Sequence, residues 1–278
     1  MPLAWLGLAP FFAYTTAFLL LPSAAILIEA FKDDHRRWTT HNISRLFQHQ
    51  FLHAYQTSIN LSLVTAAAGA LFGFLLAYAA ASRRTPRWVR SAVTTFSGVA
   101  ANFGGIPLAF AFIATLGFLG IVTRLLKDIG LDIYGSGFTL LSFTGVAIVY
   151  VYFQIPLMVL VISPAIDGLR QEWREAAQNI GASGFQYWRY VGVPVLAPSL
   201  LGAFILLFGN AFSAYATAYA LTAGALDLVP IQIGAVVNGN VLSDPQMGYA
   251  LALGMIVVIA FAMLIYLLAQ RRAARWRR

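Results

Sequence analysis

The sequence predicts an all-α integral membrane protein with six transmembrane helices. Of its 278 residues, 60% are hydrophobic and only 10% are charged, whereas soluble domains average about 25% charged residues. Six apolar stretches each approach or exceed the roughly 20 residues that a membrane-spanning helix needs. We expect one transmembrane domain over residues 1–278. Its predicted spans lie near residues 3–30, 57–81, 92–121, 138–162, 195–221 and 247–269.

Local features set the expectation for individual spans. The first has no basic residues before it and no convincing small-residue cleavage site, so we predict a retained helix and not a signal peptide. The second is rich in alanine and glycine between Ala66 and Gly73, which favours close helix packing. The third is interrupted by Asn102–Pro107, which predicts a bend or a short unwound piece. The fourth contains Gln154 and Pro156.

Basic residues predict the orientation of the chain. Twelve of the 18 lie on one side of the predicted spans: four between 83 and 90, three between 170 and 189, and five between 271 and 278. The other side has six, from Lys32 to Lys127. The positive-inside rule then places both termini in the cytoplasm. This distribution at membrane edges also disfavours nucleic-acid binding, although the net charge is +8.

The first outer loop holds all four histidines: His35, His41, His49 and His53. The last two are four residues apart and share a helix face, as metal ligands do. No cysteine exists in the chain, and no carboxylate completes a tight ligand set. We therefore predict a solvated, partly helical loop and no metal site.

Residues 164–194 form the longest polar segment between apolar stretches. Ser163-Pro164 is typical of a helix start. The following helix has an apolar face that includes Trp173, Ala176 and Ala177, and a polar face that includes Glu175. We therefore predict an amphipathic helix that begins at Ser163-Pro164.

The second half of this segment predicts another short helix. Gly181 stands where the first helix should end in a left-handed turn. Ser183 and Gln186 then form a predicted capping box for an aromatic helix, and Gly192 and Pro194 end that helix.

This segment resembles the coupling motif of binding-protein-dependent ABC importer permeases. The family pattern is Glu-Ala-Ala, three residues, Gly, nine residues, then Ile-x-Leu-Pro. Valines replace the isoleucine and leucine here, and both are also apolar. The matching residues are Glu175, Ala176, Ala177, Gly181, Val191, Val193 and Pro194. The resemblance implies a type I ABC importer permease fold, with a cytoplasmic coupling helix pair through which ATPases act.

The resemblance also implies partners and a place in the cell. The partners are two cytoplasmic ABC ATPase subunits, a second permease subunit that is identical or homologous, and an extracytoplasmic substrate-binding protein. The chain would be a multi-pass protein of the bacterial cytoplasmic (inner) membrane. In the family, a segment at the position of 229–237 helps to close the pathway and faces the binding protein.

The chain lacks the residues of an ATPase or another enzyme. A phosphate-binding loop needs a lysine after a glycine-rich turn, and the only lysines, Lys32 and Lys127, have no such context. We expect no cofactor in this chain, with ATP and Mg bound by a partner ATPase. The alternative is a small secondary carrier or channel that is not coupled to ATP, but such carriers usually keep an ionisable group inside the membrane.

Polar residues of the fifth span are our candidates for lining the solute pathway. Asn210, Ser213 and Thr217 fall on one face of a continuous helix, and Tyr215 lies between them. Lining a pathway and hydrogen bonding between helices are equally consistent with this stripe. The run around it, with 244–252, resembles the branch that imports polyamines, aminoethylphosphonate, ferric iron or sulfate. We expect a small polar solute such as a polyamine or aminoethylphosphonate, although a buried dication would want a counter-charge that the spans lack.

Overall fold

The protein is helical, as the sequence predicts. The computed structural model describes residues 3–82, 85–238 and 244–275, and their only extended pairing is one antiparallel bridge between Lys32 and Trp38. Six of its helical segments are long and apolar enough to cross a membrane. They are Leu8–Glu29, His49–Ala81, Gly105–Asp128, Phe143–Asp167, Gly184–Phe212 and Pro245–Arg271.

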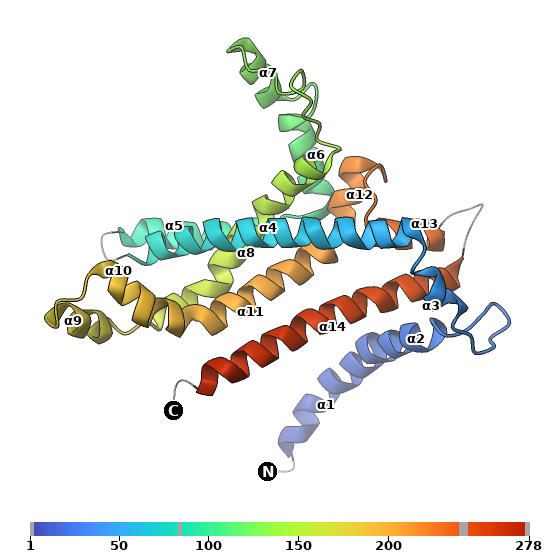
Figure 1. Cartoon of the computed structure of the whole chain (residues 1–278), viewed down its shortest axis with the longest axis horizontal. Helices are drawn as coiled ribbons and strands as arrows, with labels where there is room; N and C mark the ends of the chain where they lie inside the picture. Colours follow the sequence, from blue (N-terminus) through green and yellow to red (C-terminus); the bar gives the residue numbers. More distant parts are fainter. Residues whose placement is uncertain (1–2, 83–84, 239–243, 276–278) are drawn as a thin grey trace. The chain divides into compact units, whose positions relative to one another are not determined.

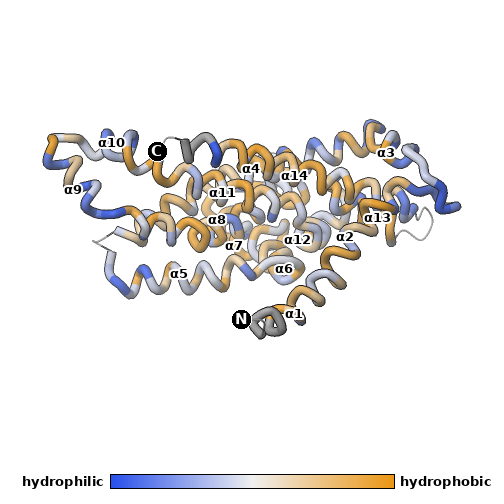
Figure 2. Tube along the Cα trace, turned by 90° about the horizontal axis from the view of Figure 1, so that it is seen from below, coloured by the Kyte–Doolittle hydropathy of each residue, from blue (hydrophilic) through white to orange (hydrophobic). Residues whose placement is uncertain are grey.

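Figure 2 shows hydrophobic residues along most of the helices and hydrophilic ones around α9 (Gln171–Asn179) and at the start of α5 (Arg87–Asn102). Four residues of the predicted basic clusters, Arg83, Arg84, Arg277 and Arg278, lie outside the described residues.

The chain forms two compact units. The first comprises Met1–Gln56 and Asp227–Ala260, and the second comprises Thr57–Leu226 and Phe261–Arg278. Helices α4 (His49–Ala81) and α14 (Pro245–Arg275) run through both.

The first unit begins with a long exposed helix. It consists of α1 (Leu3–Thr15), the π-helix η1 (Thr16–Leu20) and α2 (Leu21–Glu29). Pro22 has no N–H with which to continue the helical ladder, and the wider π turn lies directly before it. This segment spans most of the first predicted stretch.

The core of the first unit lies where three helices meet. The short α3 (His41–Arg45) lies before α4, and α13 (Val229–Asn238) lies before α14. Tyr55 of α4 donates a hydrogen bond of 2.6 Å to the carbonyl of Leu251 on α14. Buried around it are Phe51, Ala54, Val229, Met247, Ala250 and Leu251.

Two side-chain contacts link helices α3 and α4 to the loops of this unit. Arg45 lies 2.5 Å from Asp244. Partial burial of Asp244 raises its pKa, but hydrogen bonds from the Arg45 side chain and the Met247 amide outweigh this effect, so the pKa lies below its ordinary value. His53 contacts Asp227 at 3.2 Å and its ring stacks on that of His49. Among the residues that the structure describes, no group of three or more His, Asp or Glu side chains is arranged to hold a metal ion.

The second unit is built around α8 (Phe143–Asp167), whose buried residues pack against α5 and α11 (Val193–Phe212). α4 also packs against α8: a side chain on Gly69 would overlap Gln154, and one on Gly73 would reach Met158. The predicted close packing at the small residues of the second span is therefore confirmed.

Two of the predicted spans are interrupted. The third stretch, expected near 92–121, forms α5 and α6 (Gly105–Leu116) with a break at Phe103-Gly104, and then α7 (Ile121–Asp128). The fifth, expected near 195–221, forms α11 and α12 (Ala216–Thr222) with a break at 213–215. Figure 1 shows α6 and α12 close together, in agreement with their contacts.

Candidate functional site

The 164–194 loop begins later than predicted. We expected a helix to start at Ser163-Pro164, and this prediction is wrong: α8 continues through both residues to Asp167. The Ser163 hydroxyl bonds back to the Val159 carbonyl at 2.6 Å and does not cap a new helix. A proline inside a membrane helix is tolerated where neighbouring groups compensate for the missing hydrogen bond. The first loop helix is therefore only α9, which follows an extended Arg170.

α9 ends in the predicted left-handed turn. Gly181 has φ +77°. Its amide donates to the Gln178 carbonyl at 2.9 Å, and the Ala182 amide donates to the Ala177 carbonyl at 2.9 Å. This pair of bonds is the Schellman motif, which satisfies the free carbonyls at a helix end. The sequence prediction of positive φ at Gly181 is confirmed.

The predicted capping box is also present. The Ser183 hydroxyl accepts from the Gln186 amide at 3.2 Å, and the Gln186 side chain accepts from the Ser183 amide at 2.7 Å. They begin α10 (Gly184–Tyr187), which continues through the π-helix η2 (Trp188–Gly192) into α11. Pro194 does not end this helix as predicted. It is the second residue of α11, directly after the wider π turn of η2, and the helix continues through it.

The aromatic residues of α10 and η2 divide between two sides. Trp188 packs edge-on against Tyr78 of α4, with ring centroids 5.0 Å apart, and Gly192 leaves room for the Trp188 ring. Phe185 and Tyr190 are exposed on the other side. The second loop helix is therefore attached to the membrane helices by one aromatic face and leaves the other free.

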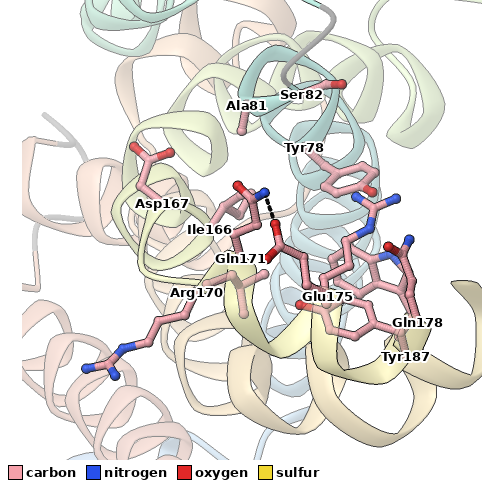
Figure 3. A pocket seen from close by; sticks show the side chains of 13 residues that line it. Tyr78, Ala81, Ser82, Ile166, Asp167, Arg170, Gln171, Glu175, Gln178 and Tyr187 are labelled. Carbon is pink, nitrogen blue, oxygen red and sulfur yellow. Dashed lines mark hydrogen bonds between the residues drawn. The ribbon is translucent and has the colours of Figure 1, made fainter. Parts of the chain in front are cut away.

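A polar cavity of about 680 Å³ lies between α9 and the ends of α4 and α8. Figure 3 shows Gln171 and Glu175 pointing toward each other inside it, joined by a hydrogen bond from the amide to the carboxylate, while Arg170 turns away. The residues that line it are Tyr78, Ala81, Ser82, Ile166, Asp167, Leu169, Arg170, Gln171, Arg174, Glu175, Gln178, Tyr187 and Trp188. Beside it, Asp167 at the end of α8 pairs with Arg90 of α5 at 2.6 Å.

The cavity shows which way each face of α9 points. Glu175 shares the cavity face with Gln171 and its helical neighbours. The opposite face includes Ala176, which is exposed, and Trp173 and Ile180, which are 38% and 85% exposed. Ala177 lies at the border between the two faces and is half-buried. Glu175 therefore lies across the helix from the apolar surface, on the polar face that the sequence predicts.

The four candidate pathway residues are not on one helix. Asn210 is exposed near the end of α11, and Ser213 and Tyr215 are exposed in the break after it. Thr217 lies beyond the break in α12, where it is only 4% exposed and is hydrogen-bonded to Gly105 at the start of α6. The predicted continuous stripe is interrupted because the helical ladder ends at Phe212.

Sequence reasoning missed the side chains of α8 that hold α11 and the break after it. Tyr150 donates to the Ala214 carbonyl at 2.8 Å, and Gln154 donates to the Leu207 carbonyl at 2.9 Å. Gln154 was visible in the sequence as a polar residue inside an apolar span, but its partner was not. The Thr217–Gly105 contact joins residues more than 100 positions apart, and no local pattern indicates it.

The geometry of the 164–194 loop and the interrupted spans can be compared with known proteins. A family model described as "Binding-protein-dependent transport system inner membrane component" matches residues 69–275, well over half of the chain. The chain belongs to this family. It is a multi-pass permease component of the inner membrane and not the ATPase of such a system. Membership favours the permease over the alternative of an uncoupled secondary carrier.

Relatives of this chain are named as transporters of different substrates. The probable sulfate transport system permease protein cysT of Prototheca wickerhamii is 28% identical over 58% of this chain and 60% of its own length. The sulfate permease CysT of Salmonella typhimurium is 25% identical, over 73% of this chain and 69% of its own length. The spermidine/putrescine permease PotB of Haemophilus influenzae is 24% identical over 94% of this chain and 91% of its own length.

The fold also matches a solved transporter. A chain from the crystal structure of a bacterial ABC transporter involved in the import of the acidic polysaccharide alginate aligns with a TM-score of 0.72. The identity is 21%, and the alignment covers 98% of this chain and 95% of the other. At this identity the likeness establishes the fold alone, which is that of an ABC importer permease.

Proposed function

We propose that this permease conducts a small polar solute into the cell and receives the energy for transport at the loop formed by α9, α10 and η2. Two cytoplasmic ATPases, a second permease subunit and an extracytoplasmic binding protein complete the system. The observation that carries the proposal is the exposed apolar face of α9, with Trp173, Ala176 and Ile180 directed away from the protein's own helices. An exposed apolar face beside polar residues is typical of a helix that docks in a partner's groove.

The proposal assigns different roles to the two faces of α9. The outer face, centred on Ala176, makes contact with the ATPase. The cavity face, with Glu175, sets the position of α9 against the ends of α4 and α8. A charge on the outer face should therefore release the ATPase, because a buried anchor surface does not tolerate an unpaired charge. Loss of the Glu175 carboxylate should leave the ATPase bound but uncoupled.

Co-purification of the ATPase with permease variants tests this division. We expect Ala176→Asp to lose the ATPase, and Gln178→Glu, which adds a charge to the cavity face of the same helix, to retain it. Glu175→Ala should retain the ATPase, but its ATP turnover should no longer respond to the loaded binding protein. The melting temperature of each permease in detergent serves as a control for folding. A stable Ala176→Asp variant that keeps its ATPase and transports normally would show that the docking surface lies elsewhere.

Ala177 gives a graded comparison on the same helix. It is half-buried, so Ala177→Asp should both weaken ATPase binding and lower the melting temperature of the permease. The exposed Ala176→Asp variant should affect ATPase binding alone.

We propose that the pathway passes the break between α11 and α12. Asn210, Ser213 and Tyr215 are exposed there in the middle of an apolar segment. Exposed polar groups and non-helical backbone are tolerated at membrane depth only where protein or a water-filled cavity covers them. Thr217 contributes to this region by accepting a hydrogen bond from the backbone amide of Gly105 at the start of α6.

The charges of the spans favour an anionic or neutral solute over a polyamine. In the candidate spans of the described chain, acidic residues occur only as the last residue, at Glu29, Asp128 and Asp167. A dication would find no counter-charge in this subunit, whereas amide and hydroxyl groups suit a sulfate-like or phosphonate solute. Calorimetry on the binding protein that stimulates the ATPase should show binding of sulfate or aminoethylphosphonate. Tight binding of spermidine in the same experiment would reverse the assignment.

We also propose that both termini face the cytoplasm, as the distribution of basic residues predicts. This places the 164–194 loop on the side where ATP is available, and the α3 and α13 region on the side of the binding protein.

A further inference from the structure

The two interrupted helices of the second unit break next to each other. Between α5 and α6, Gly104 is extended and Gly105 has φ +69°. Between α11 and α12, the helical ladder is interrupted from Ser213 to Tyr215. Figure 1 shows that α6 and α12, which follow these breaks, lie together. Each break leaves backbone groups that need partners inside the membrane.

One hydroxyl joins the two breaks. The Gly105 amide, at the start of α6, donates to Thr217 Oγ1 at 2.8 Å, and the same hydroxyl donates to the Gly105 carbonyl at 3.3 Å. Thr217 is 4% exposed, so water does not compete for this contact. The side chain of one interrupted helix thus bonds both backbone groups of Gly105, at the start of the other.

The part of the chain before the second break is held by a different helix. Tyr150 and Gln154 of α8, both 0% exposed, donate to the carbonyls of Ala214 and Leu207. Ala214 is therefore held by hydrogen bonding to α8, whereas Thr217, three residues later, is held by hydrogen bonding to α6. The chain passes from one to the other through Tyr215, whose ring stacks on that of Tyr219 in α12 with centroids 5.4 Å apart.

We propose that Thr217 is a positioning residue that latches α6 and α12 into one body, which pivots at the two breaks as the permease transports its solute. The hinges are Phe103-Gly104 and 213–215, where α6 and α12 change their angle relative to α5, α8 and α11. Space at the first hinge supports this assignment, because a Cβ on Gly104 would meet no atom within 4 Å. The contact that must slide is the edge-to-face pair of Phe112 on α6 and Tyr152 on α8, whose ring centroids are 5.7 Å apart.

Two substitutions of Thr217 test the latch. Thr217→Val keeps the shape of the side chain but removes the hydroxyl, and it leaves the Gly105 amide without a partner. Thr217→Ser keeps the hydroxyl. We expect uptake per folded permease to fall about tenfold or more in Thr217→Val and to stay within about twofold of wild type in Thr217→Ser.

Further readouts separate positioning from simple destabilisation. In Thr217→Val the ATPase should remain bound. It should hydrolyse more ATP per solute transported, because the conformational change that follows ATP hydrolysis no longer moves α6 and α12 together. Retention of the ATPase also distinguishes this result from a failure of the proposed α9 docking surface. If Thr217→Val only lowers the melting temperature, with unchanged uptake per folded permease, the latch has no role in transport and the proposal is wrong.

A disulfide tests whether the two helices stay together. A Cβ on Gly105 would lie 3.8 Å from that of Ala216, close to the mean of about 3.8 Å for disulfides. The chain has no cysteine of its own, so Gly105→Cys with Ala216→Cys gives a single pair. Because the left-handed backbone at residue 105 strains a cysteine, the reduced form of the same protein is the reference. Oxidation should leave uptake unchanged relative to this reference, and a disulfide that blocks uptake would show that the helices separate.

Discussion

The turn at Gly181 offers the sharpest test of the coupling role proposed for the 164–194 loop. Its φ of +77° is a conformation that residues with a side chain rarely adopt, and a Cβ there would meet no atom within 4 Å. The penalty of a substitution is therefore the backbone strain alone, about 1–2 kcal/mol for a residue other than glycine. This corresponds to a loss of about 5–30-fold in the population of the native turn.

We expect Gly181→Val to insert into the membrane in normal amounts but to lose transport. The strain falls on the junction of α9 and α10 and not on the spans, so the melting temperature of the permease should change little. Gly181→Asn should retain more uptake, because asparagine tolerates the left-handed region better. The assay is uptake into vesicles, with ATP turnover measured in the same preparation.

Gly184 provides a matched control in the same loop. A Cβ at this position would also meet no atom within 4 Å, but the backbone of Gly184 does not have positive φ. Gly184→Val adds the same side chain three residues away and should retain most of the uptake. Equal uptake by Gly181→Val and Gly184→Val would show that the left-handed turn is not needed for coupling.

Three further outcomes are expected elsewhere in the chain. In intact cells, an impermeant thiol reagent should label His41→Cys and spare Arg87→Cys, and the reverse result would contradict the predicted orientation. Gly254→Ala places a Cβ 2.8 Å from Cζ of Tyr55 and should destabilise the first unit by about 1–3 kcal/mol, measured as a lower melting temperature. The lowered pKa of Asp244 means that its ion pair stabilises the protein at neutral pH, and this stability is lost as the pH falls below the ordinary carboxyl pKa near 4. Asp244→Asn should therefore remove part of the acid-induced decrease in melting temperature, and an unchanged pH profile would contradict this.

Local sequence signals predicted the six spans and the turn and capping box of the 164–194 loop, but not where that loop begins and ends. The Gly181 turn and the Ser183–Gln186 capping box depend on backbone bonds between neighbours, so the residues themselves specify them. The prediction of a helix start at Ser163-Pro164 was wrong because the same residue pair is compatible with a helix start and with the interior of a membrane helix. The choice between the two depends on the packing of α8 against α5 and α11, which no local pattern records.

The sequence alone also could not show which way the Glu175 side chain points. Helical periodicity separates a polar face from an apolar one, but it does not say which face meets the rest of the protein. In a soluble protein the apolar face would pack inward. Here the polar face of α9 lines the cavity and the apolar face is exposed. This inversion is the expected arrangement for a helix whose packing partner is another protein.

The helix that joins the loop to the pathway explains how the two proposed sites work together. From Gly184 to Phe212 the chain is helical without interruption, about 43 Å at the usual rise of 1.5 Å per residue. Trp188 fixes one end of this rod against α4, and Gln154 holds the other end against α8.

A packed rod of this kind tilts or shifts as a whole and does not bend gradually. A displacement of the loop therefore reaches the break at 213–215, where the helical ladder is free to change angle. Beyond the break, α12 packs against α6, and the Thr217 hydroxyl joins it to the backbone of Gly105. The latch is accordingly the point at which movement of one helix becomes movement of two.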